Sequence, residues 1–191
     1  MDFPVDLPLD VHPRPATRAY GAPSPAGTGA GTGGGGISLG VISLEEKDYR
    51  PIAGYPFQRW GERAGRPFAD LRPLGPDAAR RVWRRTVQIS GGDWDGALPS
   101  DRFPRQDRLN LRDPATAWDE ASVRDWLLAH CPDRNRPVLA CYGPEWAVEV
   151  EWGAFCDHWL TFLWVDACAW PTSEAWFLRC YNELFVFGHR L

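Results

Sequence analysis

Residues 146–152, Trp-Ala-Val-Glu-Val-Glu-Trp, decide the fold, because apolar and polar side chains alternate along them. Successive side chains of a strand point to opposite faces of a sheet. The two Trp and two Val therefore share one face, and the Ala and both Glu share the other. The pattern predicts an antiparallel strand with one face against the core and an anionic face toward solvent.

Two hairpins are expected around this strand. Residues 138–142 predict its partner, because Gly-Pro-Glu at residues 143–145 supplies a tight turn. Residues 176–181 and 184–187 are rich in aromatic and β-branched side chains and flank Asn-Glu, which predicts a second hairpin.

Residues 159–165 are apolar on both faces except at Thr161. They predict a central strand, and a buried helical turn continuing from Phe155 is the alternative. Residues 136–191 also hold 6 of the 11 Trp, so the predicted sheet of about five strands is expected to supply most of the core.

A helix is expected after Leu74, because Pro76 suits a first helical turn and an apolar stripe follows at helical spacing. The stripe consists of Ala78, Val82, Trp83 and Thr86. The opposite side carries Arg80, Arg81, Arg84 and Arg85.

Residues 117–130 predict a second helix, with Thr116 as N-cap and Asp119 in a position that resembles a capping box. Its apolar stripe consists of Val123, Trp126, Leu127 and His130. His130 stands near the helix C-terminus, and we expect it to play a structural role. Together these elements predict an α+β fold with a C-terminal antiparallel sheet flanked by two helices.

The remaining segments lack a regular pattern. Residues 1–36 are rich in Pro and Gly, which predicts a disordered tail and leaves residues 37–191 as a single domain. Residues 37–44 predict an edge strand or a lead into the domain. Residues 49–74 predict an irregular packing segment, and residues 90–114 predict a long loop.

The formal net charge of -4 belongs to the C-terminal region. Residues 136–191 carry three Arg and seven Asp or Glu, which gives -4, whereas charges in residues 1–135 balance. A nucleic-acid-binding domain normally carries a basic surface, so this distribution argues against nucleic acid as the partner. The helix face from Arg80 to Arg85 is the alternative that would bind DNA or RNA.

Location is inferred from what the sequence lacks. It has no run of about 18 apolar residues for a membrane span and no basic and apolar regions of a signal peptide, which predicts a cytoplasmic protein. The five cysteines form no Cys-x-x-Cys pair, so we expect reduced thiols in the core. They are Cys131, Cys141, Cys156, Cys168 and Cys180.

One set of polar residues could carry chemistry, namely Glu149, Glu151, Asp157, His158 and Asp166. Carboxylates with a histidine can bind a divalent metal or transfer protons. Their spacing matches no metal signature, so no metal ligand and no cofactor is predicted. The structural interpretation is that outward charges on a sheet keep the protein soluble.

The region from Tyr49 onward resembles a small bacterial family of unknown function. The similar pieces are Tyr49-Arg-Pro-Ile52 with Trp60, Asp70-Leu-Arg-Pro-Leu74 before the Ala78 to Trp83 helix, Cys141-Tyr142, Trp152-Gly-Ala-Phe155 with Trp159 and Phe162-Leu163, and Phe187-Gly188. The resemblance covers some 140 residues and implies no activity. In style, the chain is also similar to immunity proteins of bacterial toxin systems.

These observations favour a non-enzymatic intracellular binding protein, with an immunity-type antitoxin as its specific form. It would present Glu149, Glu151 and Asp157 on an acidic sheet face to a basic protein partner. The alternative is a metal-dependent or acid-base hydrolase with its site around Glu149, Glu151, His158 and Asp166.

Overall fold

The structure, a computed structural model, describes residues 42–52, 71–92, 97–113, 119–163, 166–181 and 183–190. All of them belong to the second of two units into which the chain divides, Gly40–Leu191. The predicted tail, residues 1–36, lies outside the described residues. So do Trp60, Thr116 and most of the segment predicted to be irregular.

The centre of the domain is a seven-stranded sheet in which every neighbouring pair is antiparallel. Its order is β1-β4-β3-β5-β6-β7-β2. The strands are β1 (Arg72–Pro73), β2 (Arg105–Asn110), β3 (Pro137–Gly143), β4 (Trp146–Glu151), β5 (Cys168–Pro171), β6 (Trp176–Tyr181) and β7 (Leu184–His189). The α+β class is confirmed, with seven strands in place of about five.

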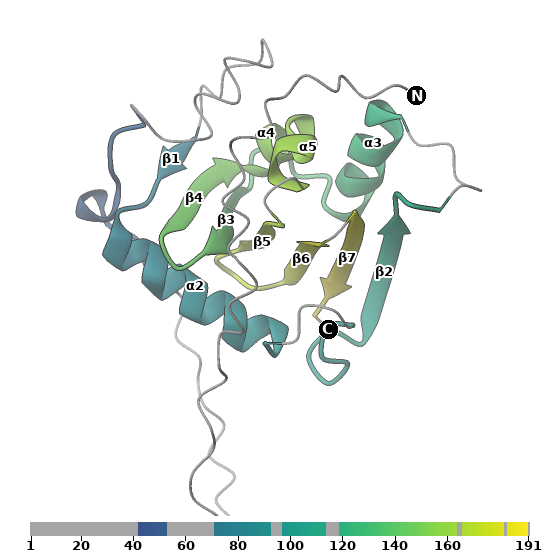
Figure 1. Ribbon diagram of the computed structural model, residues 1–191, viewed down its shortest axis with the longest axis horizontal. Helices are drawn as coiled ribbons and strands as arrows, with labels where there is room; N and C mark the ends of the chain where they lie inside the picture. Colours follow the sequence, from purple (N-terminus) through teal and green to yellow (C-terminus); the bar gives the residue numbers. More distant parts are fainter. Residues whose placement is uncertain are drawn as a thin grey trace, which may run out of the picture. The chain divides into compact units, whose positions relative to one another are not determined.

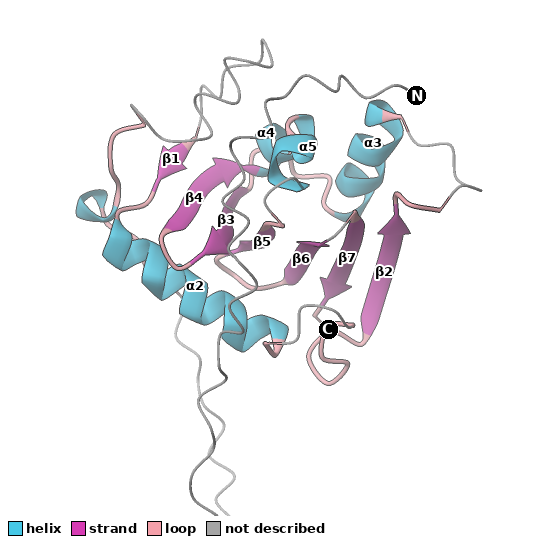
Figure 2. Ribbon diagram, viewed as in Figure 1, coloured by secondary structure: helices cyan, strands magenta, loops and turns pink. Residues whose placement is uncertain are grey.

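Helices cover both faces of this sheet, as Figures 1 and 2 show. The helical segments are η2 (Glu46–Asp48), α2 (Pro76–Ser90), α3 (Glu120–His130), α4 (Trp152–Asp157) and α5 (Trp159–Leu163). Helix α2 lies across one face, and α3, α4 and α5 lie across the other. None of the described helices is long and apolar enough to cross a membrane.

The prediction that one sheet face is open to solvent is wrong. Val148 and Val150 pack under α4 and α5, as expected, but Ala147 on the other face is also fully buried. Small side chains at Ala147 and Cys141 leave room for α2 to approach closely, together with Ala78 and Ala79 of the helix itself. Alternate side chains of β4 therefore enter two separate apolar cores, one on each face of the sheet, instead of one core and the solvent.

Both predicted hairpins are confirmed. Strand β3 pairs with β4 through a turn at residues 144–145, and β6 pairs with β7 from Trp176↔His189 to Tyr181↔Leu184.

The strand predicted over residues 159–165 is instead the short helix α5. Trp159, Phe162 and Leu163 are buried and stand three and four residues apart, which is the spacing of one helix face. Phe162 stacks on Phe155 of α4 with ring centroids 4.3 Å apart. Because most of its side chains are apolar, the segment shows no helical periodicity in the sequence. The alternative interpretation, a buried helical turn that continues from Phe155, is therefore confirmed.

The loop predicted over residues 90–114 contains strand β2, which pairs with β7 along its whole length. Its sequence, Arg-Gln-Asp-Arg-Leu-Asn, buries only Leu109. Charged side chains are typical of an edge strand, where they discourage pairing with other chains. That composition concealed the strand from hydrophobic patterning.

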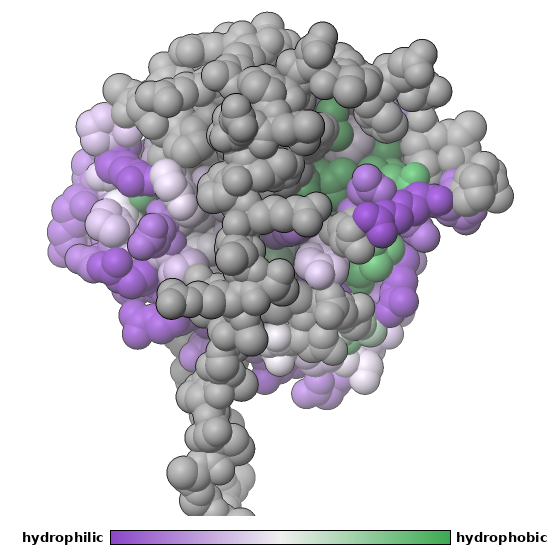
Figure 3. Space-filling model, in the orientation of Figure 1, coloured by the Kyte–Doolittle hydropathy of each residue, from purple (hydrophilic) through white to green (hydrophobic). Residues whose placement is uncertain are grey.

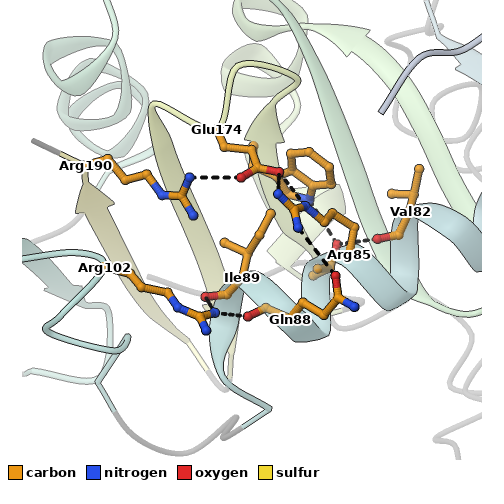
Figure 4. A network of polar contacts seen from close by, with 9 residues as sticks. Val82, Arg85, Gln88, Ile89, Arg102, Glu174 and Arg190 are labelled. Carbon is orange, nitrogen blue, oxygen red and sulfur yellow. Dashed lines mark hydrogen bonds and ion pairs between the residues drawn. The ribbon is translucent and has the colours of Figure 1, made fainter. Parts of the chain in front are cut away.

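Helix α2 confirms the predicted helix after Leu74, but Arg85 does not lie on a solvated face. Its side chain is 7% exposed and forms an ion pair with Glu174, which also binds Arg190 at 2.9 Å (Figure 4). Arg80 and Arg84 are exposed, as expected. The residue at position 85 faces the sheet because it lies three and seven residues after Val82 and Ala78.

Helix α3 begins three residues later than expected, at Glu120. Its N-cap is Asp119, whose side chain accepts a hydrogen bond from the Ser122 amide at 2.7 Å. The Ser122 hydroxyl in turn accepts from the Asp119 amide at 3.1 Å, which completes a capping box. All five cysteines are buried and unbridged, as predicted.

Candidate metal centre

The polar residues singled out in the sequence do not converge on one site. Glu149 is held at the β1 edge, where it accepts hydrogen bonds from Tyr49 Oη and Arg72 Nη1, both at 3.2 Å. Glu151 is exposed at the end of β4, and Asp166 is exposed in a turn with φ of 51°. Together with His158 they form no group of metal-ligand geometry within the described ranges.

Asp157 and His158 line an open hollow of about 500 Å³ between α3 and the α4–α5 corner. Its lining is Glu120, Ala121, Arg124, Cys156, Asp157, His158 and Trp159. The Asp157 carboxylate accepts a hydrogen bond from the Arg134 guanidinium at 2.7 Å. Burial raises the pKa of the Cys156 thiol, which disfavours the reactive thiolate at neutral pH. The described residues that line the hollow form no group of metal-ligand geometry.

Folding also cancels the charge separation seen along the sequence. Acidic residues of the C-terminal region pair with arginines from the first 135 residues: Glu149 with Arg72, Asp157 with Arg134, Glu174 with Arg85, and Glu183 with Arg112. Figure 3 shows hydrophilic residues spread over the side of β1 and α2. Capture of a basic partner through Glu149, Glu151 and Asp157 stays a prediction.

Three other side chains do come together: Asp107 of β2, His130 of α3 and His189 of β7. One potential ligand atom from each lies within 4.8 Å of the other two. No other such group of three forms among the residues that the structure describes. The group is partly open, since Asp107 is exposed and both histidines are half-buried.

The sheet register positions two members of this group. Strand β2 pairs with β7 so that Arg105 faces His189 and Asp107 faces Phe187. Residues directly opposite each other project from the same face, as do residues two apart on one strand. Asp107 and His189 are therefore diagonal neighbours on the face that α3 covers.

Helix α3 supplies the third member from its last residue. His130 lies over the sheet with its ring 4.5 Å from that of Phe187 and 5.6 Å from that of His189. Trp126, one helical turn earlier, packs against His130 at 4.2 Å. The negative end of the helix dipole is at this terminus, which favours a cation there.

Hydrogen bonding fixes which nitrogen of His130 faces the group. Nδ1 lies 2.8 Å from the carbonyl oxygen of Trp126, which can only accept, so Nδ1 carries the proton. Nε2 then points at Asp107 Oδ2, 3.1 Å away. With a neutral ring, a lone pair would face a carboxylate, and a positive charge between them resolves that conflict. Either a second ring proton or a metal ion can supply it.

The surroundings of His189 favour its neutral form. Burial lowers the pKa of His189, and the neighbouring His130 and Arg105 act in the same direction, while Asp107 opposes them. A histidine must be neutral at the ligating nitrogen to bind a metal. Its surroundings thus favour the ligand form.

Two histidines and one carboxylate form a metal-ligand set known from catalytic sites. Such sites bind Zn²⁺, Fe²⁺ and related ions through three protein ligands and keep further positions open for water or substrate. The Nδ1 hydrogen bond from His130 to a backbone carbonyl is also the usual support for a ligating imidazole. The arrangement can therefore hold a transition-metal ion with one side toward solvent.

Sequence reasoning missed this group for identifiable reasons. His130 was assigned a structural role, Asp107 fell in a predicted loop, and His189 lay beyond the end of the last predicted strand. The three are separated by 23 and 59 residues, so no short motif joins them. Only the β2–β7 register could have suggested the pairing.

Comparison with known proteins adds a family. A protein-family model described as "protein of unknown function" matches residues 65–173, a range that includes Asp107 and His130. No curated protein matches the chain, and no solved structure does.

Proposed function

The chain belongs to the DUF2947 family of proteins of unknown function, and we propose that it is a metal-dependent hydrolase with Asp107, His130 and His189 as metal ligands. The family assignment agrees with the resemblance noted in the sequence. It adds no activity, so the proposal depends on the geometry of the site.

The observation that supports the proposal most directly is the orientation of the His130 ring. Its Nδ1 proton is committed to Trp126, and its Nε2 faces Asp107 with His189 alongside. A bound divalent ion would satisfy the two histidine nitrogens and the carboxylate at once. An imidazolium at His130 would satisfy the carboxylate but leave His189 without a role.

The number of ligands supports the hydrolase class. A structural zinc site is closed by four protein ligands, whereas three leave a position for water. A metal ion lowers the pKa of its bound water toward neutrality and polarises a substrate carbonyl or phosphoryl oxygen. The Asp107 side chain is 62% exposed, which supports access from solvent. A cytoplasmic location is part of the proposal, since five unbridged thiols suit a reducing compartment.

Metal binding is the first test. Chelator-treated protein is titrated with Co²⁺ while its visible absorption is recorded, and with Zn²⁺ in a calorimeter. We expect one ion per chain. The variants Asp107→Asn, His130→Asn and His189→Asn should each weaken binding by about tenfold or more, because each removes a ligand.

His158→Asn is the matched control, because His158 lines the hollow between α3 and the α4–α5 corner and is not one of the three proposed ligands. It should bind cobalt as the unaltered protein does. If the three ligand variants match this control, or if no stoichiometric binding is seen, the proposal is wrong. Hydrolysis of p-nitrophenyl phosphate and p-nitrophenyl acetate by the zinc-loaded protein then tests the reaction class.

A further inference from the structure

Arg105 stands beside the candidate metal centre and has no ion-pair partner within the described ranges. It lies directly opposite His189 in the β2–β7 pairing and is exposed. Most arginines that the structure describes pair with a carboxylate, whereas the Arg105 guanidinium has no side-chain partner among these described residues.

The register places this guanidinium on the correct side of the sheet. Strand β7 lies between β6 and β2, and Trp176, His189 and Arg105 form one row across the three strands. Directly opposed residues share a face and have Cβ atoms about 5 Å apart. Arg105 therefore projects from the same face as both His189 and Asp107, at the open end of the group.

Arg105 is the direct cross-strand neighbour of His189. The same row contains a second hydrogen-bond donor: the indole Nε1 of Trp176 is buried and has no acceptor among the described residues. By contrast, Arg108 is exposed on the same strand but lies three residues away from Arg105 and so faces the opposite side.

We propose that the site takes an anionic substrate, a phosphate ester or phosphate-like group, that bridges the metal ion and the Arg105 guanidinium. This inference rests on the metal centre proposed above. Arginine is suited to the task, since its planar fork donates two parallel hydrogen bonds to a phosphate or carboxylate. A metal and an arginine on one phosphoryl group would both stabilise charge that develops during transfer to water.

Charge balance favours a phosphate over a carboxylate as the bound group. The ligand set brings one carboxylate, so a divalent ion with Asp107 leaves one positive charge, and Arg105 adds another. A phosphate monoester, with close to two negative charges at neutral pH, balances that sum. A monocarboxylate would leave one positive charge uncompensated.

The experiment uses the cobalt-loaded full chain and separates the two proposals. Cobalt absorption reports the metal centre by itself. Inorganic phosphate, and in a parallel titration acetate, is then added while the cobalt bands are followed. We expect phosphate to perturb the bands with saturation, and acetate to bind about tenfold more weakly.

Arg105→Gln should still bind one cobalt ion per chain and lose phosphate affinity by about tenfold, whereas the control Arg108→Gln should lose neither. Cobalt binding with no effect of phosphate, equal affinities for phosphate and acetate, or equal behaviour of the two arginine variants would overturn the anion proposal alone. Absence of cobalt binding would remove the metal centre and the anion proposal with it.

Discussion

The Nε2 atom of His130 lies 3.1 Å from Oδ2 of Asp107, although one residue ends helix α3 and the other lies in the edge strand β2. This contact links the edge strand to the helix layer above it. His189 lies in β7, the strand next to β2, and its ring stacks on that of His130. A bound ion would therefore join β2, β7 and α3.

Metal should therefore stabilise the fold as well as occupy a site. An ion that binds only the native state adds about 2.7 kcal/mol at a free concentration 100 times its Kd. For a domain of this size, that corresponds to a rise in Tm of about 5 to 10 °C. Thermal unfolding with Zn²⁺ and with chelator measures it. His189→Asn should show at most about half of this zinc-dependent rise, because its affinity is about tenfold or more weaker. A rise equal to that of the unaltered protein would contradict the ligand assignment.

The sequence predicted the sheet better than the site, and the reason is physical. Strands β4, β6 and β7 can be predicted from alternation or from aromatic runs next to a turn, which are local signals. The edge strand β2 has no apolar pattern because its outer side faces solvent, and α5 has none because it is buried on most sides. The group of Asp107, His130 and His189 depends on the pairing of β2 with β7, a long-range contact that no local pattern encodes.

Breaking the buried ion pair between Arg85 and Glu174 should strongly destabilise the fold. Each side chain is 7% exposed, and Gln88 Oε1, 3.5 Å from Arg85, is too distant to replace the carboxylate. Glu174→Gln removes the carboxylate that faces the buried guanidinium, which should lower the free energy of unfolding by about 3 to 5 kcal/mol. Urea denaturation followed by tryptophan fluorescence measures this change.

Glu183→Gln is a matched control for that substitution. Glu183 also has a positive φ, 64° against 54° at Glu174, and also pairs with an arginine, Arg112. Both partners of this second pair are 55% exposed, so its loss should cost about 0 to 1 kcal/mol. Equal costs for the two substitutions would show that burial does not set the strength of the Arg85 pair.

Gly188 precedes His189 and has no room for a side chain. A Cβ there would lie 2.7 Å from Leu98 Cδ1 and 2.9 Å from Phe103 Cβ. Gly188→Ala should therefore destabilise the fold by about 1 to 3 kcal/mol through overpacking. The shift of β7 should also weaken cobalt binding, because His189 is the next residue.

Gly143 offers the comparison for this change, since a Cβ there meets nothing within 4 Å. Gly143→Ala should be neutral or stabilise by up to about 1 kcal/mol, because Ala restricts the unfolded chain. Its cobalt affinity should match that of the unaltered protein. If Gly188→Ala behaved in the same way, residues 98 and 103 would not be packed against β7 as the structure describes.

The buried thiols should resist alkylation in the native protein. Burial raises the pKa of Cys141 to about 12, while a hydrogen bond with Thr86 opposes the rise slightly. Burial also raises the pKa of Cys168 and Cys180. Thiolate is the reactive form, so at pH 8 a pKa of about 12 leaves roughly one Cys141 thiol in ten thousand reactive, compared with about one in ten at the ordinary value of 9.0.

Mass spectrometry after iodoacetamide treatment at pH 8 should show these three thiols unmodified in the native protein and all five alkylated in guanidinium chloride. Rapid alkylation of Cys141 without denaturant would mean that α2 opens from the sheet, because Thr86 and Val82 of that helix cover the thiol's side of the core.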